Sequence, residues 1–345
     1  MNDFLFVKFK IMKAAVFYGP RDIRTEEVER PAIQDDEVLI KVKACGICGS
    51  DLHMYKLNMF SVVLLRQSEK GGIPGHEYSG VVEEVGSKIS GFKKGDRVVS
   101  FSSGGMAEYV PVRNVVKIPS GVSYEEAALI EPLSNSYYAL IKGNPSKEEN
   151  VVIFGAGTIG LGIIQCIKAF DFNINKLIAI DLSDFRLNTA KLLGADEVIN
   201  ARKKNPRLRI KKFVQSVPLP QMPTIATPKV DVIYDCVGYV KDHKGPLVLQ
   251  QAIDMASVGT GRIIIHGLYE GAISLNLMEL VTKQVTIMGS FGFSPEGVKK
   301  CFDLLQSKKV DESQIITHRF SLDEAKEAFE TQSNTEESIK VLIKP

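Results

Sequence analysis

The sequence has little net charge, few cysteines and no long apolar run, and each of these shortages excludes a class of protein. The formal net charge of the 345-residue chain is only +2, so the overall charge gives no sign of binding to nucleic acid or to a membrane surface. No apolar stretch reaches the roughly 20 residues that cross a bilayer. The five cysteines are an odd, sparse set, which excludes the disulfide framework of a small secreted protein.

The same shortage of cysteine pairs fits a reducing compartment, and we expect the protein to be cytoplasmic. The N-terminal stretch agrees, because Asp3, Lys8 and Lys10 interrupt its apolar residues and no signal-peptide layout is present. We interpret residues 1–11 as an upstream extension, since Met12 begins a run with the pattern of a strand that leads into a turn.

The length favours two domains, because one hydrophobic core rarely serves so many residues. Residues 12–130 contain short β-type runs separated by glycine, proline and charged turns, which is typical of a β-rich barrel or sandwich. From residue 123 onward, helical stretches alternate with apolar strands such as KLIAID, VDVIYD and GRIII. This alternation predicts an α/β domain with a doubly wound parallel sheet. Ser123 with Glu126, and Ser321 with Glu324, have the spacing of capping boxes that begin helices.

Residues 201–229 do not fit this alternation. Residues 201–212 are strongly basic, and prolines follow at positions 218, 220, 223 and 228. Because proline lacks a backbone N–H and fixes φ, this density excludes a regular helix or a central strand. We interpret the segment as a solvated surface loop. A polyanion-binding patch is the weaker alternative, since no aromatic residues are interleaved with the cations.

The segment GAGTIG places Gly155, Gly157 and Gly160 in the spacing of a dinucleotide-binding turn, after a strand and before a helix. The glycines permit a tight turn and close approach of a pyrophosphate, and the helix N-terminus stabilises its charge. Asp181 ends the next strand, where a carboxylate binds ribose hydroxyls and repels a 2′-phosphate. We therefore predict NAD rather than NADP, with Arg186 beside the adenosine half. The alternative is a ligand-free layer whose glycines serve packing alone.

The stretch ACGICGSDLH contains Cys45 and Cys48, three positions apart. Such a pair occurs in redox enzymes and in structural zinc sites, and one cysteine alone serves as a catalytic metal ligand. A redox pair begins a helix in a thioredoxin-like unit, and a structural site needs a second cysteine pair, which this chain lacks. A single catalytic ligand is therefore the interpretation that fits best.

Further candidate ligands are His76 and Glu77 in a glycine-rich polar stretch, and Glu131 in the apolar stretch AALIEPL. A carboxylate in apolar surroundings needs a partner or a metal. For Glu131, bonding to backbone N–H groups at a helix end is an equally good alternative. Cysteine, histidine and carboxylate are the usual ligands of a catalytic zinc ion, whose open position takes an alcohol oxygen and favours the alkoxide.

Together these residues resemble the medium-chain zinc-dependent alcohol dehydrogenase family, above all its sorbitol (polyol) and threonine dehydrogenase branch. The motifs occur in order over nearly the whole chain: GICGSDLH, GHEYSGVVEEVG, GDRV, AEYV, EPL, GAGTIG, LIAID, VDVIYDCVG and GSFG. The resemblance implies NAD-dependent hydride transfer from a secondary alcohol, polyol or amino alcohol at a zinc ion.

The resemblance also implies roles for individual residues. The implied zinc ligands are Cys48, His76, Glu77 and Glu131, the last directly or through water. Cys45 is then a packed residue of the interior. Ser50 and His53 match the relay that carries the alcohol proton towards solvent. Asp51 matches a carboxylate that orients His76.

The implied architecture is a GroES-like catalytic domain of residues 1–132 and 293–345, with a Rossmann domain of residues 133–292 inserted. Beyond the glycines, Asp181 and Arg186, the residues expected at the cofactor are Thr158, Ile159, Gly267, Leu268, Ser290 and Phe291. Family members are commonly oligomers, so we expect a homodimer or homotetramer that acts on a small-molecule alcohol, with no nucleic-acid or membrane partner.

Three features depart from the family pattern. Many relatives carry a four-cysteine structural zinc lobe where this chain has only VSFSSGGM, so we expect one zinc per chain. Met54 and Gly292 hold the places of an aromatic residue and an arginine that grip polyol hydroxyls. The stretch before His76 is also atypical and predicts a different, partly apolar pocket. The rival interpretations are a zinc-free enone or quinone reductase of the same superfamily, a thiol–disulfide enzyme, and a non-catalytic NAD-binding protein.

Overall fold

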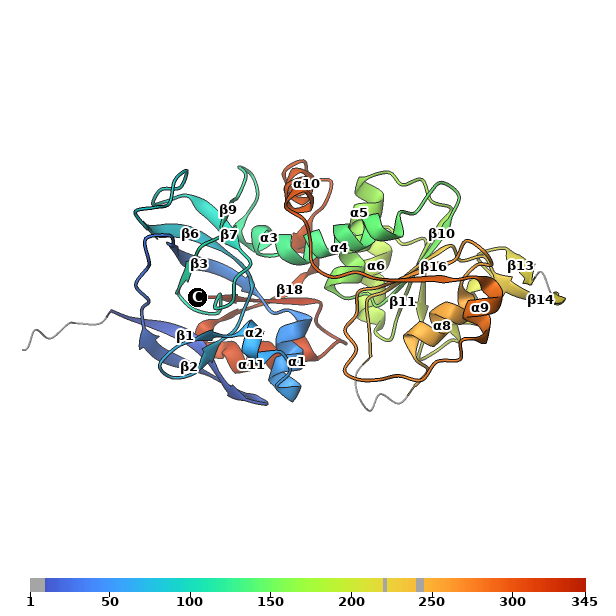
Figure 1. The fold of residues 1–345 in the computed structure, drawn as a ribbon, viewed down its shortest axis with the longest axis horizontal. Helices are drawn as coiled ribbons and strands as arrows, with labels where there is room; N and C mark the ends of the chain where they lie inside the picture. Colours follow the sequence, from blue (N-terminus) through green and yellow to red (C-terminus); the bar gives the residue numbers. More distant parts are fainter. Residues whose placement is uncertain (1–9, 220–221, 240–244) are drawn as a thin grey trace, which may run out of the picture. The chain divides into compact units, whose positions relative to one another are not determined.

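The computed structural model describes residues 10–219, 222–239 and 245–345, and the chain divides into two compact units (Figure 1). Unit 1 takes both ends of the chain, Met1–Glu131 and Asp311–Pro345, and unit 2 is Pro132–Val310. The predicted N-terminal extension lies outside the described residues except for Lys10 and Ile11. No helix among the described residues is long and apolar enough to cross a membrane.

Unit 1 consists mainly of strands. They are β1 (Ile11–Gly19), β2 (Asp22–Glu29), β3 (Val38–Gly46), β4 (Arg66–Gln67), β5 (Gly72–Ile73), β6 (Glu77–Val85), β7 (Arg97–Ser100), β8 (Tyr109–Val112), β9 (Val116–Lys117), β18 (Ile316–Ser321) and β19 (Lys340–Lys344). The helices are α1 (Gly49–Leu57), α2 (Ser61–Leu64), α3 (Tyr124–Ala128) and α11 (Ala325–Ser333), with the 3₁₀ turns η1 (Glu312–Ile315) and η2 (Leu322–Glu324).

The strands of unit 1 form a four-stranded sheet in the order β2-β1-β5-β4 and a seven-stranded sheet in the order β18-β19-β3-β6-β7-β9, with β8 on β3. The centre of the larger sheet is β3, which pairs antiparallel with β6 from Val38↔Val85 to Gly46↔Glu77. Its other edge pairs with β19 through Leu342↔Gly46. The carboxyl end of β3 therefore lies between the start of β6 and the last strand of the chain.

Unit 2 alternates strands and helices. The strands are β10 (Asn150–Phe154), β11 (Lys176–Asp181), β12 (Glu197–Asn200), β13 (Ser216–Leu219), β14 (Met222–Pro228), β15 (Val232–Asp235), β16 (Arg262–Ile265) and β17 (Thr286–Gly289). The helices are α4 (Ile130–Gly143), which starts at the boundary, α5 (Thr158–Ala169), α6 (Asp184–Leu192), α7 (Pro206–Ile210), α8 (Val248–Met255), α9 (Met278–Lys283) and α10 (Pro295–Gln306).

The main sheet of unit 2 is parallel and has the strand order β12-β11-β10-β15-β16-β17. This is the order of a doubly wound dinucleotide-binding fold, in which ligands bind beyond the carboxyl ends of the strands. Its strands are apolar almost throughout, since both faces of such a sheet are covered. The predicted combination of an α/β domain that has a doubly wound parallel sheet and a β-rich domain is confirmed.

The boundaries of unit 2 differ from the predicted ones mainly at its end. The sequence places the second boundary before residue 293, whereas the structure groups α10 with unit 2. The contacts of α10 explain the difference. Lys300 lies 5.8 Å from the ring centroid of Tyr137 in α4, and Gly297 packs against the same ring.

The segment 201–229 is not the irregular loop that we expected. It contains α7, where Asn205 caps the helix and Pro206 occupies the first turn, a position that needs no N–H. The strands β13 and β14 then form a separate two-stranded antiparallel ribbon. Prolines are tolerated there because a ribbon leaves one edge of each strand unpaired. The prediction that no central strand runs through this segment agrees with the structure.

Candidate metal and cofactor sites

Cys48 is the N-cap residue of α1, directly after the carboxyl end of β3. Its backbone N–H donates a hydrogen bond of 3.0 Å to Oδ2 of Asp51, which fixes the start of the helix. A helix N-terminus favours negative charge on a sulfur held there. Cys45, by contrast, is fully buried inside β3, where burial raises the pKa of its thiol well above the usual range. Cys48 is therefore the cysteine that can act as a ligand.

Three candidate ligands converge in unit 1. Ligand atoms of Cys48, His76 and Glu77 all lie within 4.8 Å of one another. The pairing of Gly46 with Glu77 brings the start of β6 beside the residues that follow β3, so the sheet register assembles the cluster. One thiolate, one imidazole and one carboxylate are a donor set of an open, tetrahedral zinc site.

The glycine at position 46 is required by this close approach. A Cβ atom added at Gly46 would fall 2.3 Å from Oε2 of Glu77, which no packing permits. Gly46 therefore leaves the space in which the Glu77 carboxylate lies.

Glu77 is held by a buried cation that the sequence analysis missed. Nζ of Lys340, in β19, donates hydrogen bonds to Oε2 of Glu77 at 2.6 Å and to the carbonyl oxygen of Ile47 at 3.0 Å. The two side chains are only 2% and 1% exposed. Burial lowers the pKa of Lys340, but the charges of Glu77 and Cys48 outweigh it, so the net shift is upward. Lys340 thus stays protonated and occupies Oε2, which leaves Oε1 for a metal.

His76 lies in a buried and negatively charged environment. Its Nδ1 is buried and has no hydrogen-bond partner among the described residues, and the same holds for Oδ1 of Asp51. The two atoms are 3.9 Å apart, too far for the expected orienting hydrogen bond. Burial lowers the pKa of His76, but the negative charges of Cys48, Asp51 and Glu131 outweigh it and raise the pKa well above its usual value. The cluster attracts positive charge, and its donors fit a metal ion.

Glu131 lies outside the three-residue cluster. It stands half-buried in the first turn of α4, and its charge acts on both His76 and Lys340. The structure thus brings three of the four predicted metal ligands together.

The predicted relay residues Ser50 and His53 are one turn apart on α1, so they share a face of the helix. The His53 ring contacts the edge of Phe60, with centroids 6.4 Å apart. Phe60 has φ of 64°, a left-handed backbone that bulky residues rarely adopt.

The segment around Phe60 exposes apolar side chains. Leu57, Phe60, Val62 and Val63 are 50%, 39%, 92% and 70% exposed. Met54, by contrast, is fully buried.

Gly292 adopts φ of 78°, which suits glycine better than the arginine of the polyol branch.

In unit 2, the glycine turn follows β10 as predicted. Gly155 adopts φ of 93°, and a Cβ at Gly160 would fall 1.9 Å from its carbonyl oxygen, so both positions need glycine. Gly157 is the N-cap residue of α5, and no side chain accepts a hydrogen bond from the first N–H groups of this helix. The first N–H groups of the helix, including those of Thr158 and Ile159, therefore have no capping side chain and can bind a phosphate.

Asp181 joins the end of β11 to the glycine turn. Its Oδ2 accepts a hydrogen bond of 2.7 Å from the N–H of Ala156, and Oδ1 accepts from the N–H groups of Leu182 and Ser183. If Gly157 carried a Cβ atom, that atom would lie 3.6 Å from Nη1 of Arg186, so the guanidinium is close to the turn. The predicted adenosine-binding residues thus lie together beside the turn.

The remaining predicted cofactor residues follow β16 and β17 at the same carboxyl edge of the sheet. Gly267 packs against Gly238, since a Cβ on Gly267 would lie 2.0 Å from the Gly238 nitrogen. Leu268 is half-buried, Ser290 is buried, and Phe291 is 84% exposed.

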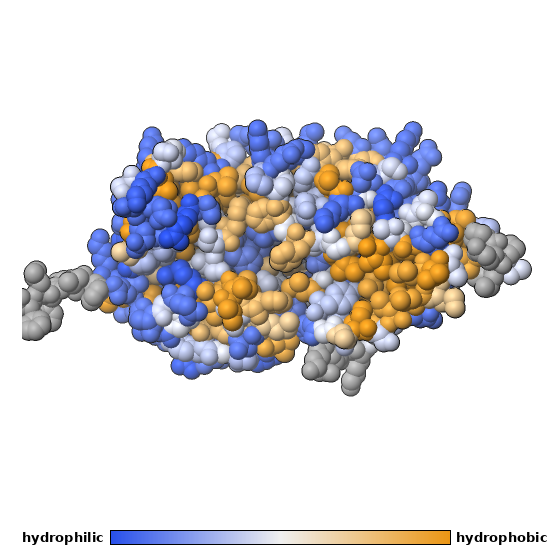
Figure 2. Space-filling view, in the orientation of Figure 1, coloured by the Kyte–Doolittle hydropathy of each residue, from blue (hydrophilic) through white to orange (hydrophobic). Residues whose placement is uncertain are grey.

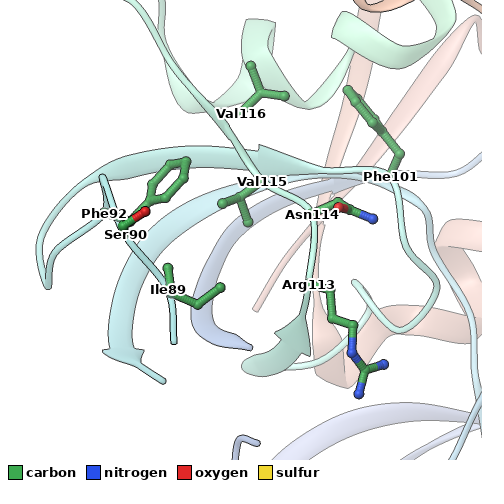
Figure 3. Close-up of a pocket in the computed structure, with 8 residues that line it drawn as sticks. All are labelled: Ile89, Ser90, Phe92, Phe101, Arg113, Asn114, Val115 and Val116. Carbon is green, nitrogen blue, oxygen red and sulfur yellow. The ribbon is translucent and has the colours of Figure 1, made fainter. Parts of the chain in front are cut away.

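A cavity of about 330 Å³ opens elsewhere in unit 1. Figure 3 shows its apolar lining, with the guanidinium of Arg113 turned away from it. That guanidinium pairs with Asp36 and Glu37. None of the lining residues is a predicted site residue, so this cavity is separate from the candidate ligands.

Comparison with known proteins agrees with this geometry. Residues 34–120 match the alcohol dehydrogenase GroES-like domain, and residues 158–307 match the zinc-binding dehydrogenase domain. The chain belongs to the zinc-binding alcohol dehydrogenase family. The predicted resemblance is confirmed.

Individual relatives cover almost the whole chain. Sorbitol dehydrogenase of Bacillus subtilis is 33% identical, over 97% of this chain and 97% of its own. L-idonate 5-dehydrogenase of Vitis vinifera is 29% identical, over 96% and 94%. The crystal structure of 2R,3R-butanediol dehydrogenase from Bacillus subtilis superimposes with a TM-score of 0.81 at 28% identity, covering 97% of this chain and 99% of that one.

The buried ion pair generates a stability prediction. We expect Lys340→Met to lower the free energy of unfolding of the metal-free protein by about 3–5 kcal/mol, because it leaves the Glu77 carboxylate buried without a partner. Adding Glu77→Gln should restore most of this loss, because the uncompensated charge is then gone. Urea unfolding in the presence of a chelator measures both variants.

The control is Lys13→Met, which breaks the exposed pair with Asp323 and should change little. A Lys340→Met protein no less stable than this control, or a double variant less stable than Lys340→Met alone, would contradict the role given to the pair.

Proposed function

We propose that the protein is a zinc-dependent dehydrogenase that transfers a hydride between a secondary alcohol, polyol or amino alcohol and NAD. The observation that carries the proposal is the convergence of Cys48, His76 and Glu77, with a buried, unpartnered His76 nitrogen among them. Its relatives include sorbitol, L-idonate and butanediol dehydrogenases, which supports the same reaction class.

In this proposal Cys48, His76 and Glu77 hold one zinc ion, and Glu131 contributes charge or a water-mediated contact. Bound zinc supplies a Lewis acid that polarises the alcohol oxygen. Ser50 accepts the hydroxyl proton and His53 passes it towards solvent. Lys340 keeps the carboxylate of Glu77 in one orientation.

The proposed cofactor is NAD, bound with its pyrophosphate at the uncapped N-terminus of α5 and its adenosine ribose at Asp181. The hydride chemistry belongs to the nicotinamide, and the protein orients it.

The rival interpretation as a zinc-free reductase is weaker, because it leaves the cluster's negative charge without a counter-ion. The complete burial of Cys45 argues against a thiol–disulfide enzyme, because the second thiol of the pair is out of reach of a substrate.

Metal content and turnover test this proposal together. We expect one zinc per chain in the purified protein and none in Cys48→Ala. Ser50→Ala should keep the zinc but lose roughly 100-fold or more in kcat, because only proton transfer is affected. Elemental analysis measures the zinc content, and NADH formation measures the turnover.

Because apolar residues surround Phe60, butane-2,3-diol and simple secondary alcohols should react faster than sorbitol, xylitol or threonine.

Zinc retained in Cys48→Ala would contradict the ligand assignment, and two zincs per chain would contradict the single site. A zinc-loaded protein that binds NAD but oxidises none of these alcohols would favour the non-catalytic alternative.

The cofactor preference is tested at Asp181. We expect the unaltered protein to bind NADH more tightly than NADPH. Asp181→Asn should shift the ratio of the two dissociation constants towards NADPH by roughly 10- to 100-fold, because the charge that repels a 2′-phosphate is gone. Asp184→Asn, three positions later and paired with Lys203, is the control and should leave the ratio unchanged. Tighter binding of NADPH by the unaltered protein would contradict the NAD assignment.

We also propose a homodimer formed through unit 2. The strand β17 ends the sheet order, so one of its edges is unpaired within the described residues. Beside it in sequence, α9 and the residue before it expose Leu277, Met278 and Val281, which are 51%, 67% and 68% exposed. Figure 2 shows an apolar area over the part of the surface that carries α8 and α9. A two-fold axis at β17 pairs the two edges and covers these side chains.

Val281→Glu is therefore expected to raise the dissociation constant of the dimer by roughly tenfold or more, because it places a charge in the apolar interface. Sedimentation velocity over a concentration series measures the change. Leu192→Glu is the matched control, since Leu192 is 83% exposed on α6, which packs on β12 at the opposite edge of the sheet. Equal behaviour of the two variants would contradict this interface.

For the cellular location we propose the cytoplasm. None of the five cysteines, all of them among the described residues, forms a disulfide, which suits a reducing compartment. Recovery of the native protein from an oxidising compartment would contradict this proposal.

A further inference from the structure

Arg66 differs from the other arginines of unit 1, because no acceptor among the described residues reaches its guanidinium. Its Nε is buried and has no hydrogen-bond partner there. Each of the other six arginines of this unit donates to a carboxylate or to a carbonyl oxygen: Arg21, Arg24, Arg30, Arg97, Arg113 and Arg319. A guanidinium is always charged in proteins, so a half-buried one without an anion is costly.

Backbone pairing fixes where Arg66 lies. It stands opposite Ile73 in the antiparallel pair of β4 and β5. The link of residues 101–106, which follows β7, pairs with the residues just after Ile73, since the N–H of Gly105 donates a hydrogen bond of 2.9 Å to the carbonyl oxygen of Gly75. A Cβ atom on Gly104 would fall 2.8 Å from Nε of Arg66, so the arginine side chain runs directly over this link.

A second bond holds the two segments together. Oγ of Ser103 donates a hydrogen bond of 3.2 Å to the carbonyl oxygen of Val63, three positions before Arg66. Gly104, the next residue of the link, has φ of 107°, a backbone that suits glycine. The stem of the arginine is therefore fixed between its own strand and the link before any ligand arrives.

The neighbouring groups do not neutralise the guanidinium. Glu69 acts on its charge but is exposed and accepts a hydrogen bond of 2.7 Å from the N–H of Glu29. The ring of Tyr78 packs against Gly105, and a tyrosine hydroxyl is uncharged at neutral pH. Burial lowers the pKa of Arg66, and the weaker effects of Tyr78 and Glu69 do not offset it.

The free donors of Arg66 select an oxyanion. Of its three guanidinium nitrogens only Nε is both buried and unpartnered, so the two terminal nitrogens are open to a ligand. A planar guanidinium with its terminal donors free matches two oxygen atoms of a phosphate or of a carboxylate, to which it donates two parallel hydrogen bonds.

This place is close to the candidate ligand cluster. Paired Cα atoms of antiparallel strands lie about 5 Å apart, and the three residues from Ile73 to His76 span at most about 11 Å. The Cα atoms of Arg66 and His76 are therefore within roughly 16 Å of each other. An alcohol with a chain of several carbons extends over such a distance once the arginine side chain reaches towards it.

We propose that Arg66 binds an oxyanion, a phosphate or a carboxylate group, beside the candidate ligand cluster. The group belongs either to the alcohol substrate or to free inorganic phosphate, since both present the same oxygen atoms. The first source rests on the proposed function and deepens it, because the substrate is then an alcohol that carries an anionic group. The second source requires no reaction.

The first measurement is calorimetric titration of the full chain with inorganic phosphate, at constant ionic strength and with NAD present to occupy the glycine turn. Arg66→Gln should lower phosphate affinity roughly 10- to 100-fold, the effect of lost hydrogen bonds from a charged group. Arg66→Lys keeps the charge but not the planar donors, so its loss should be smaller. Phosphate bound elsewhere is common to all variants.

The matched control is Arg113→Gln. Arg113 belongs to the same unit, but its guanidinium is exposed and already pairs with Asp36 and Glu37. This variant should leave phosphate affinity unchanged. Circular dichroism checks that each variant folds, and Arg66→Lys provides the comparison if Arg66→Gln does not fold.

The second measurement identifies the source of the anion. NADH formation gives kcat/KM for two matched pairs, sorbitol 6-phosphate with sorbitol and 3-hydroxybutyrate with butan-2-ol. If the group belongs to the substrate, an anionic member should have a kcat/KM higher by roughly tenfold or more, and Arg66→Gln should erase that preference while Arg113→Gln keeps it. No preference, with phosphate binding that depends on Arg66, assigns the site to the free anion.

The remaining outcomes separate this inference from the proposed function. Equal phosphate affinity of the unaltered protein and Arg66→Gln would overturn the anion site. A preference for the anionic alcohols that persists in Arg66→Gln would overturn its assignment to the substrate. Absence of turnover with every alcohol, while phosphate binding still depends on Arg66, would overturn the proposed function and leave the anion site in place.

Discussion

The buried ion pair between Glu77 and Lys340 is the constraint on which the cluster of Cys48, His76 and Glu77 depends. The two residues are 263 positions apart, yet their side chains meet where almost no solvent reaches. A buried carboxylate without a partner strongly destabilises a fold, so the last strand of the chain must lie beside β3 for the start of β6 to hold its position. This explains why both ends of the chain form one unit. A charge needed at the ligand cluster ties the C-terminal strand to the N-terminal sheet.

The pair also sets the charge of the cluster. When ionised, Cys48, Asp51 and Glu77 bring three negative charges into a small, mostly buried volume, and Lys340 offsets only one. A divalent ion at the candidate site would offset two further negative charges. Burial lowers the pKa of His76, but the neighbouring negative charges outweigh it and raise the pKa, so the cluster favours positive charge at this position. In the proposed zinc site, protonation of His76 and metal binding would therefore compete at one residue.

The parts of this protein that sequence reasoning predicts are those with local signals. The Ser123 capping box and the turn from Gly155 to Gly160 can each be recognised from a few adjacent residues in the sequence, and both are present in the structure. Lys340 gives no such signal, because an isolated lysine in an apolar C-terminal strand has the pattern of an ordinary exposed position. Only the pairing of β19 with β3 turns it inward. The loop prediction for segment 201–229 is wrong for a related reason, since proline density excludes central strands but not a ribbon.

Arg66 shows why an unpartnered atom has meaning only with its neighbours. Nδ1 of His318 is equally buried and unpartnered among the described residues, but its ring stacks on Phe320 within one strand of a mixed sheet. A stable fold tolerates the free-energy cost of one buried polar atom without a hydrogen-bond partner. Nε of Arg66 instead belongs to a permanent charge, which the groups packed around it do not offset. The same reasoning holds beside the ligand cluster, where the unpartnered atoms of His76 and Asp51 face each other across 3.9 Å.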